Sequence, residues 1–392
     1  MGKSKSYDVI IVGAGSMGMS AGYHLARRGT RTLLIDAFDP PHAHGSHHGE
    51  PRLIRHAYGG GPAYIRLALR ADRLWRELEE RTGERLLVRS GVLNMVPRSN
   101  GALEKRIGEA KLFGVPAERL DAAEIRKRWP GVKVPDTYEG MYEPNAGYLN
   151  SESCVAAYRR LALEAGAELL TGTFVTDVKV AGQSLAFVST VQDVYVADNV
   201  ILCAGAWFRR LQSFAPVPVR ALRKTVGWFE AGAEYAEGAF PGFTLGTPHG
   251  AYYGFPDIGG AGFKIGRHDG GREWKPGEDF APFGAYPEDE ADLRDALERY
   301  FPGAAGRRLR GAACKYEMSP DEHFIVDSHP EHPNVLLAGG FSGHGFKFAS
   351  AVGELLAELT IDRKTELDVG MFSLERFRTE TTKSAESAGG TG

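Results

Sequence analysis

The chain has 392 residues, of which 43% are hydrophobic and 25% are charged, and its net charge is −3. This length favours two domains or one large one, and the composition excludes a disordered or fibrous chain. The sequence contains no apolar run of the length that an integral membrane protein needs, and no excess of basic residues that would favour nucleic acid. The cysteines (Cys154, Cys203 and Cys314) lack CxxC spacing, which excludes a disulfide scaffold or a cysteine zinc site and suits a reducing compartment.

The first residues show no targeting pattern. Met1 to Ser6 is short and polar, and the apolar stretch that follows is too brief for a signal peptide, so we expect a cytoplasmic protein. At the other end, residues 381–392 have no apolar face and are expected to form a disordered tail. Glycine is abundant, at 50 residues, and this favours tight turns and ligand-binding loops.

The N-terminal segment predicts a βαβ unit. Val9–Val12 is a β-branched run typical of a strand that is buried on both faces of a parallel sheet. Ser16–Arg28 follows as a predicted helix that Gly29 ends, and Thr32–Ile35 is a second buried strand.

Further helices and strands are predicted along the chain. An amphipathic helix begins near Tyr64, and another follows Asn150 and stops at Gly166. A last helix runs to about Thr360. Three more strands are expected at Glu168–Val175, Asn199–Cys203 and Val335–Ala338. Five stretches with shorter aromatic and β-branched runs predict an antiparallel sheet: Leu86–Val96, Tyr138–Tyr148, Lys224–Ala233, Ala251–Pro256 and Gly262–Arg267.

A glycine motif follows the first predicted strand. In Gly13-x-Gly15-x-x-Gly18 the first glycine permits a tight turn, the second lets the backbone approach a pyrophosphate, and the third lets helix and strand pack closely. The first helical turn, with Ser16 and Met17, would place its amides on the phosphates. Asp36 ends the second strand, where an acid binds a ribose hydroxyl and would repel the phosphate of NADP. The motif therefore predicts an FAD or NAD site.

Two more glycine-rich turns narrow this choice. Ile201–Trp207 and Ala338–Phe348 each run from an apolar strand into a turn of small residues, and the second contains Gly343, His344 and Gly345. Three such turns suit a dinucleotide that is held along its whole length, which favours FAD, because an NAD dehydrogenase normally needs only the first. The alternative is that they are unrelated surface turns.

Histidines, arginines and a cysteine are the remaining candidates. Four histidines between His42 and His48 could bind metal, but their flexible loop better suits a position against the cofactor. Arg52 and Arg55 would share a face if helical and could clamp a carboxylate, or they could form an ordinary solvated surface. Cys314 is either a buried core cysteine or a thiolate that is linked to a cofactor.

These motifs together resemble the monomeric sarcosine oxidase and N-methyltryptophan oxidase family, from about residue 7 to residue 375. The resemblance implies an FAD-dependent oxidase of secondary N-methyl amino acids, with the flavin 8α-methyl group bound to a cysteine as a thioether. The matching segments occur in the same order: Gly13–Gly18, Asp36–Pro41, Gly45–Gly49, Arg52–Tyr58, Tyr252–Pro256, Lys264–His268, Cys314-x-Tyr316 and Gly343–Lys347.

The resemblance implies a role for each matching residue. Cys314 would attach the flavin, Arg55 and Lys347 would hold the substrate carboxylate, and Lys264 would activate oxygen. Arg52 would lie near the flavin ring. Residues expected to line the substrate cavity are Tyr253, His268 and Tyr316. The chain departs from the family at Glu50-Pro51, where Asp-Thr is usual, so a backbone donor and a hydroxyl are lost near the flavin.

The expected fold is α/β (α+β), with a Rossmann-like FAD-binding domain and a second, mainly antiparallel substrate domain. We assign residues 1–85, 150–220 and 322–380 to the first domain, and 86–149 and 221–321 to the second. Expected cofactor-binding residues are Gly13, Gly15, Ser16, Met17, Gly18, Asp36, Val175, Cys314, Gly343, His344 and Gly345, and no metal is expected.

The expected reaction is the oxidative demethylation of sarcosine to glycine, formaldehyde and H₂O₂, by a monomer with small-molecule substrates. N-methyl-L-tryptophan is the alternative substrate, which Ser90–Asn94 and Ser319–Glu322 favour, whereas Asp36–Pro41 and Pro287–Glu290 favour sarcosine. Two more distant alternatives are a flavin dehydrogenase that does not use oxygen and a non-catalytic dinucleotide-binding protein.

Overall fold

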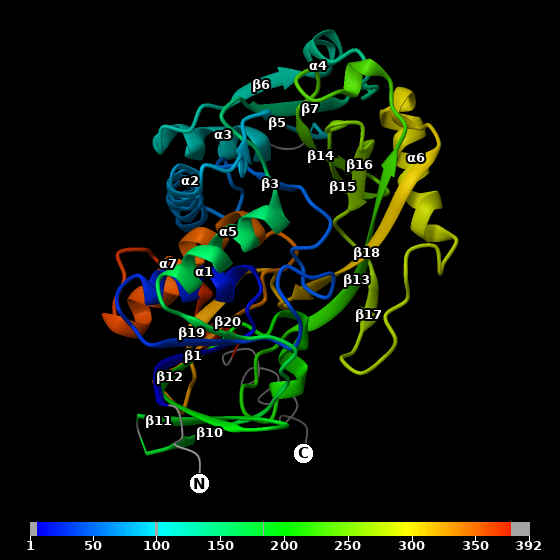
Figure 1. Ribbon diagram of the computed structural model, residues 1–392. Coiled ribbons are helices and arrows are strands. Elements are labelled where there is room, and N and C mark those ends of the chain that lie inside the picture. The colour runs from blue at the N-terminus through cyan, green and yellow to red at the C-terminus, as the bar shows by residue number, and fades with distance from the viewer. Residues whose placement is uncertain (1–5, 99–100, 183, 378–392) are drawn as a thin grey trace, which may run out of the picture. The chain divides into compact units, whose positions relative to one another are not determined.

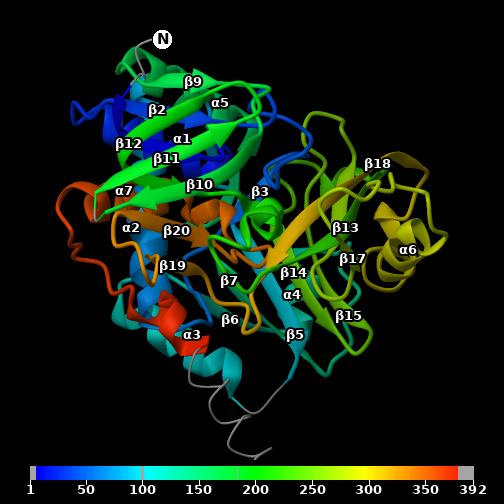
Figure 2. The same ribbon diagram turned by 90° about the horizontal axis from the view of Figure 1, so that it is seen from below.

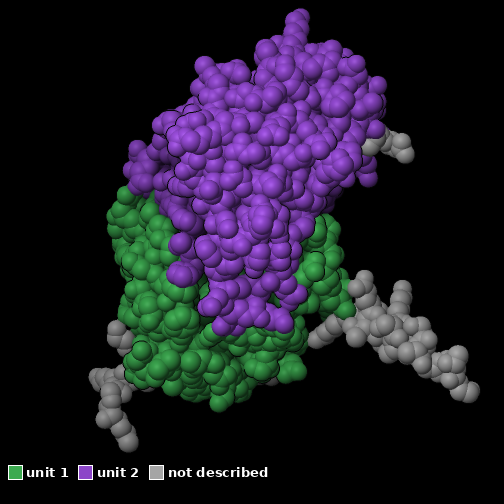
Figure 3. Space-filling model, turned by 90° about the vertical axis from the view of Figure 1, so that its right-hand side faces the viewer, with its two compact units in different colours: residues 1–42, 155–221, 317–392 green, residues 43–154, 222–316 purple. Residues whose placement is uncertain are grey.

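The computed structural model describes residues 6–98, 101–182 and 184–377, so the predicted tail at 381–392 lies outside the described residues. The chain forms two compact units, which Figure 3 shows in different colours. Unit 1 contains the described residues up to 42, residues 155–221, and the described residues from 317 onward. Unit 2 contains residues 43–154 and 222–316. Residues 43–85, which the sequence-based division gave to the cofactor domain, thus fall in unit 2, because β3 (Arg52–Ile54) pairs there with β8 (Gly147–Leu149).

Unit 1 is built on a parallel sheet whose central strand is β1 (Ser6–Val12). It pairs on one side with β2 (Thr32–Ile35) and on the other with β12 (Val194–Leu202). The parallel set is completed by β9 (Glu168–Leu170) beside β2 and by β20 (Val335–Gly339) beside β12. This confirms the predicted βαβ unit.

Antiparallel strands extend this sheet, as Figures 1 and 2 show. The hairpin of β10 (Val175–Ala181) and β11 (Leu185–Thr190) pairs with the start of β12, and β19 (Ile325–Ser328) pairs with β20. The single strand predicted at Glu168–Val175 was therefore wrong. Gly172 is left-handed (φ +60°), and the amides of Gly172 and Thr173 bond to the carbonyls of Phe38 and Asp36, so the chain turns before β10 begins.

Both faces of the parallel sheet are covered, which explains the continuous apolar runs in its strands. On one face α1 (Ser16–Ala26) packs against α7 (Ala349–Ile361), and the two helices lie side by side in Figure 1. Ile11 and Leu34 point to α1, since a Cβ on Gly18 or Gly22 would meet their side chains. The other face carries Ile10, Leu33 and Val200, which pack in a buried cluster with the β10–β11 hairpin.

Unit 2 is built on a mixed, mainly antiparallel sheet, as predicted. Its order is β17-β13-β16-β15-β14-β5-β7-β6, with β18 beside β13. Among the described strand pairs of this sheet with an assigned direction, β5 and β14 run parallel and the others run antiparallel. The strands are β5 (Val92–Pro97), β6 (Glu118–Asp121), β7 (Tyr138–Glu143), β13 (Arg220–Phe229), β14 (Gly242–Thr247), β15 (Gly250–Phe255), β16 (Phe263–Arg267), β17 (Arg272–Trp274) and β18 (Arg308–Met318).

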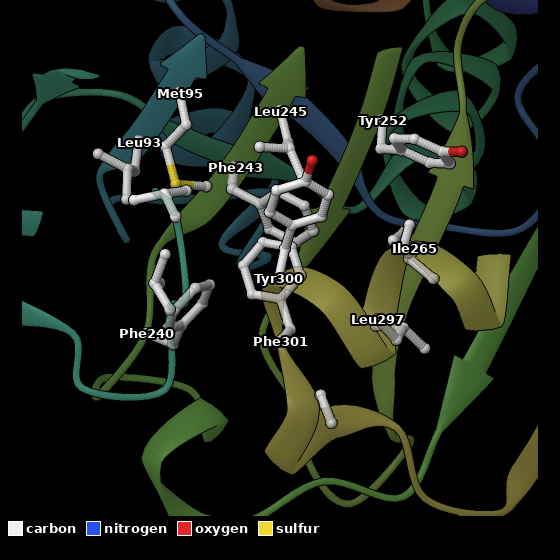
Figure 4. Close-up of a cluster of buried hydrophobic side chains, with 14 of the residues drawn as sticks. Leu93, Met95, Phe240, Phe243, Leu245, Tyr252, Ile265, Leu297, Tyr300 and Phe301 are labelled. Atoms are coloured by element: carbon white, nitrogen blue, oxygen red, sulfur yellow. The ribbon is translucent and has the colours of Figure 1, made fainter. Parts of the chain in front are cut away.

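Aromatic side chains fill the core of unit 2. Phe243 and Phe263 stack with ring centroids 5.4 Å apart. The ring centroid of Phe301 lies 4.6 Å from that of Phe243, and Figure 4 shows these two side chains. Their burial anchors the sheet that carries the candidate site residues. The other elements of this unit are α2 (Pro62–Thr82), β4 (Leu87–Val88), α3 (Ala102–Leu112), α4 (Ala122–Arg128) and α6 (Glu288–Tyr300), while α5 (Ser151–Glu164) runs from unit 2 into unit 1. Among the described residues, no helix is long and apolar enough to cross a membrane.

Candidate functional site

In unit 1 the three predicted glycine turns meet at one edge of the sheet. They follow β1, β12 and β20, which are adjacent and parallel, so all three turns lie at the carboxyl ends of neighbouring strands. This is the edge at which open α/β sheets bind their ligands.

The first turn has no room for side chains at two of its glycines. Gly13 is left-handed (φ +95°), and a Cβ there would lie 2.3 Å from the carbonyl oxygen of Cys203. A Cβ on Gly18 would lie 1.9 Å from the carbonyl oxygen of Gly13. Gly15 caps α1 with no side-chain hydrogen bond, so the first-turn amides beside Ser16 and Met17 have no side-chain cap. A close-packed turn with uncapped helix amides fits the pyrophosphate of a dinucleotide.

Substitution of Gly18 tests this geometry. We expect Gly18→Ala to destabilise unit 1 and to lower the flavin content of the purified protein at least tenfold, because the new methyl group must displace the Gly13 backbone. Flavin absorbance per polypeptide measures the effect. Gly29→Ala is less suitable as a control because Gly29 is left-handed, so Gly108→Ala, where a Cβ meets open space, is the matched variant. Equal flavin content in Gly18→Ala and wild type would contradict this reading of the turn.

Asp36 lies beside the first turn, as predicted. It is buried; its Oδ2 accepts the Ala14 amide (2.7 Å), and its Oδ1 accepts the Phe38 amide (2.9 Å) and lies 3.3 Å from His42 Nε2. These contacts fix the carboxylate at the end of β2, where it still has acceptor capacity for a ribose hydroxyl. Val175 begins β10 and packs against the adjoining buried cluster.

The turn after β20 has an unusual backbone. Gly340, Ser342 and Gly343 all have positive φ, of 63°, 48° and 74°. Successive amides in such a turn can converge on an anion. The same segment carries His344, whose Nε2 lies 3.0 Å from the Glu322 carbonyl, and Gly345. Lys347 follows, buried, with Nζ donating to the His344 carbonyl at 2.7 Å.

In unit 2 the backbone carbonyls of the loop at residues 46–51 hold two cationic side chains, Arg52 and Lys264. Arg52 donates to the carbonyls of Ser46, His48, Gly49 and Pro51 at 2.6–3.0 Å. Lys264 on β16 donates to two of the same carbonyls, Gly49 (2.6 Å) and Pro51 (3.0 Å). Arg52 lies on a strand rather than on a helix, so the condition under which Arg52 and Arg55 would share a helical face is not met, and the carboxylate clamp stays a prediction.

Lys264 is almost fully buried. Its ammonium lies 5.1 Å from the Trp228 ring centroid and 4.9 Å from that of Phe255, a favourable setting for a cation. Burial, followed by the charge of Arg52, lowers its pKa well below the usual value, while Cys314 and Glu152 oppose this. Among the described residues no carboxylate pairs with Lys264, so an anionic ligand could supply the partner that its charged form lacks.

Cys314 lies buried on β18, within the electrostatic reach of four cations. Burial raises the pKa of its thiol, and the positive charges of Arg52, Lys264, Lys224 and Lys315 act in the opposite direction. Burial has the larger effect, so the pKa of the Cys314 thiol lies above its ordinary value, and the four cations limit this rise.

Three aromatic candidates lie together near Cys314. Tyr253 and Tyr316 are hydrogen-bonded to each other, and burial raises the pKa of Tyr253 to about 12. The His268 ring lies 5.8 Å from the Tyr316 ring. Lys224 fixes this group, because its Nζ donates to the carbonyls of His268 (2.6 Å), Asp269 (2.9 Å) and Gly270 and lies over the Tyr316 ring.

Arg55 is positioned directly after β3. Its Nη1 donates to Asn94 Oδ1 at 2.9 Å, and its guanidinium lies over the Tyr58 ring at 5.2 Å. Asn94 is buried on β5 and is itself fixed by Thr244. Within the described ranges Arg55 has no carboxylate partner. Its guanidinium N–H groups can therefore donate to the carboxylate of a ligand.

The structure thus gathers the predicted residues into two sets. Unit 2 brings together the oxygen-activating, flavin-attaching and cavity-lining candidates, and unit 1 holds the glycine turns, Asp36 and Lys347. The predicted pairing of Arg55 with Lys347 joins different units and stays a prediction. A side-chain contact holds the histidine-rich loop, since His48 Nδ1 lies 2.8 Å from Glu152 Oε1. In the described part of the chain no cluster of three or more metal-ligating side chains occurs.

Sequence reasoning missed three residues at this site. Asn94 and Lys224 orient functional side chains, and neither stands in a recognisable chemical motif. Glu317 lies buried on β18, against the turn after β20, where a carboxylate is unexpected. Only its place three residues after Cys314, on the same strand β18, offered a signal.

The chain is similar to known flavoenzymes. A family model described as FAD dependent oxidoreductase matches residues 8–359. Monomeric sarcosine oxidase from Bacillus sp. (strain B-0618) is 49% identical over 95% of this chain and 97% of its own length. N-methyl-L-tryptophan oxidase from Yersinia pestis (strain Pestoides F) is 41% identical over 95% of this chain and 100% of its own.

Solved structures share the fold. NikD, an amino acid oxidase, has a TM-score of 0.82 at 23% identity and covers 94% of this chain and 98% of its own. L-proline dehydrogenase from P. horikoshii has a TM-score of 0.82 at 22% identity, over 96% of this chain and 99% of its own.

The chain therefore belongs to the FAD-dependent oxidoreductase family. Within that family it stands with the monomeric sarcosine oxidases and the N-methyl-L-tryptophan oxidases. This confirms the fold class, the family and the enzyme class, a flavoprotein oxidase acting on CH–NH donors, that the sequence predicted.

Proposed function

We propose that the protein oxidises N-methyl amino acids, with sarcosine as the favoured substrate: sarcosine, O₂ and H₂O give glycine, formaldehyde and H₂O₂. The observation that carries this proposal is Lys264. It is a buried ammonium that lacks a carboxylate partner in the described part of the chain and whose charge couples to those of Arg52 and Cys314. The similarity to sarcosine oxidases over nearly the whole chain supports the substrate class.

Arg55 and Lys347 would hold the substrate carboxylate. The Arg55 fork offers two parallel donors, with its orientation set by Asn94 and Tyr58, and the Lys347 ammonium adds charge. Bound in this way, the N-methyl group would be presented for oxidation with little remaining freedom, which lowers the entropic part of the barrier.

FAD, when bound, would supply the redox chemistry by taking two electrons and two protons from the CH–NH group of the substrate, which becomes an imine, and passing them to O₂ to give H₂O₂. The protein residues supply position and charge. Cys314 would hold the flavin as a thioether, and its four neighbouring cations oppose the rise that burial causes in the pKa of its thiol. Lys264 would stabilise the negative charge that develops as oxygen is reduced. Water then hydrolyses the oxidised amine to release formaldehyde.

Replacement of Arg55 tests the carboxylate site. We expect Arg55→Met to lower kcat/KM for sarcosine by about 30- to 1,000-fold, mainly through KM, because a charged pair is lost in a partly buried site. Steady-state peroxide production measures this. Arg73→Met, on the exposed face of α2, is the control and should leave kcat/KM within a factor of two. An unchanged KM in Arg55→Met would assign the carboxylate to other residues.

N-methyl-L-tryptophan is the second candidate substrate, since relatives that bear this name are 41% identical. Comparison of kcat/KM for the two compounds decides between them. We expect sarcosine to be preferred, and a tenfold preference for the tryptophan derivative would overturn that choice.

Oxygen use separates this proposal from the alternative of a flavin dehydrogenase, and an L-proline dehydrogenase shares the fold. We expect one peroxide per substrate consumed in air, owing to Lys264. Negligible peroxide would favour the dehydrogenase. A cytoplasmic location, a monomeric state and the flavin thioether also stay predictions.

A further inference from the structure

We propose that Glu317 is a flavin-site residue whose neutral carboxylic acid donates a hydrogen bond to an oxygen of the bound flavin nucleotide. Its ionisation would then give the bound flavin a pH dependence. The inference rests on the FAD site proposed above and adds a residue that none of the glycine motifs contains.

The Glu317 side chain lies on the turn that follows β20. Its backbone carbonyl accepts the Ser342 amide at 2.8 Å, and its carboxyl group accepts hydrogen bonds from the amides of Gly340 and Phe341. Glu317 therefore lies at the carboxyl ends of the parallel strands, at the edge where the three glycine turns meet.

One oxygen of this carboxyl group has no partner in the structure. Glu317 is 8% exposed, and its Oε2 is buried without any hydrogen bond among the described residues. A buried polar atom without a partner is unfavourable and rare in native proteins. Since it lies at the ligand-binding edge of the sheet, a bound nucleotide is the natural source of the missing partner.

The surroundings of Glu317 favour its protonated form. Burial raises its pKa to about 8, and the two backbone hydrogen bonds oppose this shift only in part. A titratable side chain whose charge couples to Glu317 is Cys203, directly after β12. Burial, and secondarily the charge of Glu317, raises the pKa of that thiol, so Cys203 supplies no positive charge that would favour the carboxylate. At neutral pH Glu317 is thus mainly an acid that can donate Oε2–H.

Loss of this proton would reverse the interaction. Above the pKa of Glu317 the donor disappears and a negative charge replaces it close to the flavin. A negative charge there should disfavour the reduced, anionic flavin and alter the absorption bands of the oxidised one. The bound flavin should therefore report the titration of Glu317 directly.

The experiment is an absorption titration of the oxidised holoprotein between pH 6 and 10.5. Wild type should show a flavin spectral change with a midpoint within about one unit of pH 8. Glu317→Gln, which has the same shape and stays neutral, should keep its flavin and abolish this change. Exposed Glu331→Gln, also in unit 1, should retain it. Lys264→Met should retain it as well, which separates Glu317 from a buried cation whose pKa is also strongly shifted.

A second variant guards against misfolding. Glu317→Leu removes both donor and acceptor, so it should abolish the titration and also shift the flavin absorption maxima at pH 6, whereas Glu317→Gln should match wild type at that pH. A wild-type protein with no spectral change in this range, or an unchanged midpoint in Glu317→Gln, would overturn the proposal. Protein that binds no FAD at all would instead overturn the flavin site and the proposed function.

Discussion

Replacement of Lys264 by methionine is expected to slow reoxidation of the reduced flavin by O₂ by about 10²- to 10³-fold. The Lys264 ammonium is buried between Trp228 and Phe255 and is held by the carbonyls of Gly49 and Pro51, so its charge acts in a setting that water does not screen. Methionine keeps the volume but removes the charge. Stopped-flow measurement of both half-reactions should show a much smaller loss in flavin reduction by sarcosine.

The pH dependence of reoxidation provides an independent check. The pKa of Lys264 is lowered, so the ammonium loses its proton below the usual range as pH rises, and wild-type reoxidation should slow as it does. The Lys264→Met rate should not follow this change. Lys275→Met, at an exposed position in unit 2, is the matched control and should behave as wild type. Equal losses in both half-reactions would show that Lys264 has another role.

Replacement of Cys314 by alanine is expected to convert covalently retained flavin into flavin that is fully released on acid precipitation. Wild type should keep its flavin in the pellet, because a thioether survives denaturation whereas the contacts of the folded site do not. The cations around Cys314 oppose the effect of burial, which raises the pKa of its thiol. Flavin absorbance in the supernatant and pellet measures the effect.

The other cysteines serve as controls for this result. Cys154→Ala and Cys203→Ala remove thiols for which burial raises the pKa and whose electrostatic neighbours are acidic, so neither should release flavin. Free FAD from acid-treated wild type would contradict the covalent link. It would leave the remaining flavin site unaffected.

The parallel core of unit 1 could be predicted from the sequence because its signals are local. Val9–Val12 and Thr32–Ile35 are short apolar runs on either side of a glycine turn, and strands buried on both faces require such runs. The β10–β11 hairpin was missed because its strands are half exposed and mix polar with apolar residues. The turn between β9 and β10 depends on hydrogen bonds from the amides of residues 172 and 173 to the loop after β2. That loop is distant in the sequence, so local patterns do not reveal the turn.

The candidate site was predictable only as a set of residues, and not as an arrangement. Motifs identified Arg52, Lys264 and Cys314, but no pattern in the sequence shows that Arg52 and Lys264 share the Gly49 and Pro51 carbonyls. At Glu50-Pro51, where a backbone donor and a hydroxyl are lost relative to the family, tertiary contacts that the sequence does not reveal hold the loop. The backbone amides of Glu50 and Glu152 each donate to the carboxylate of the other residue. These two hydrogen bonds hold the loop.

The most direct test of the account is the absorption spectrum of the purified protein before and after anaerobic addition of sarcosine. A flavin held beside buried cations and an arginine that takes the carboxylate should give a yellow protein that sarcosine bleaches and that air restores, with release of peroxide. A protein that stays colourless after reconstitution with FAD, or a yellow protein whose spectrum sarcosine and N-methyl-L-tryptophan both leave unchanged, would contradict it.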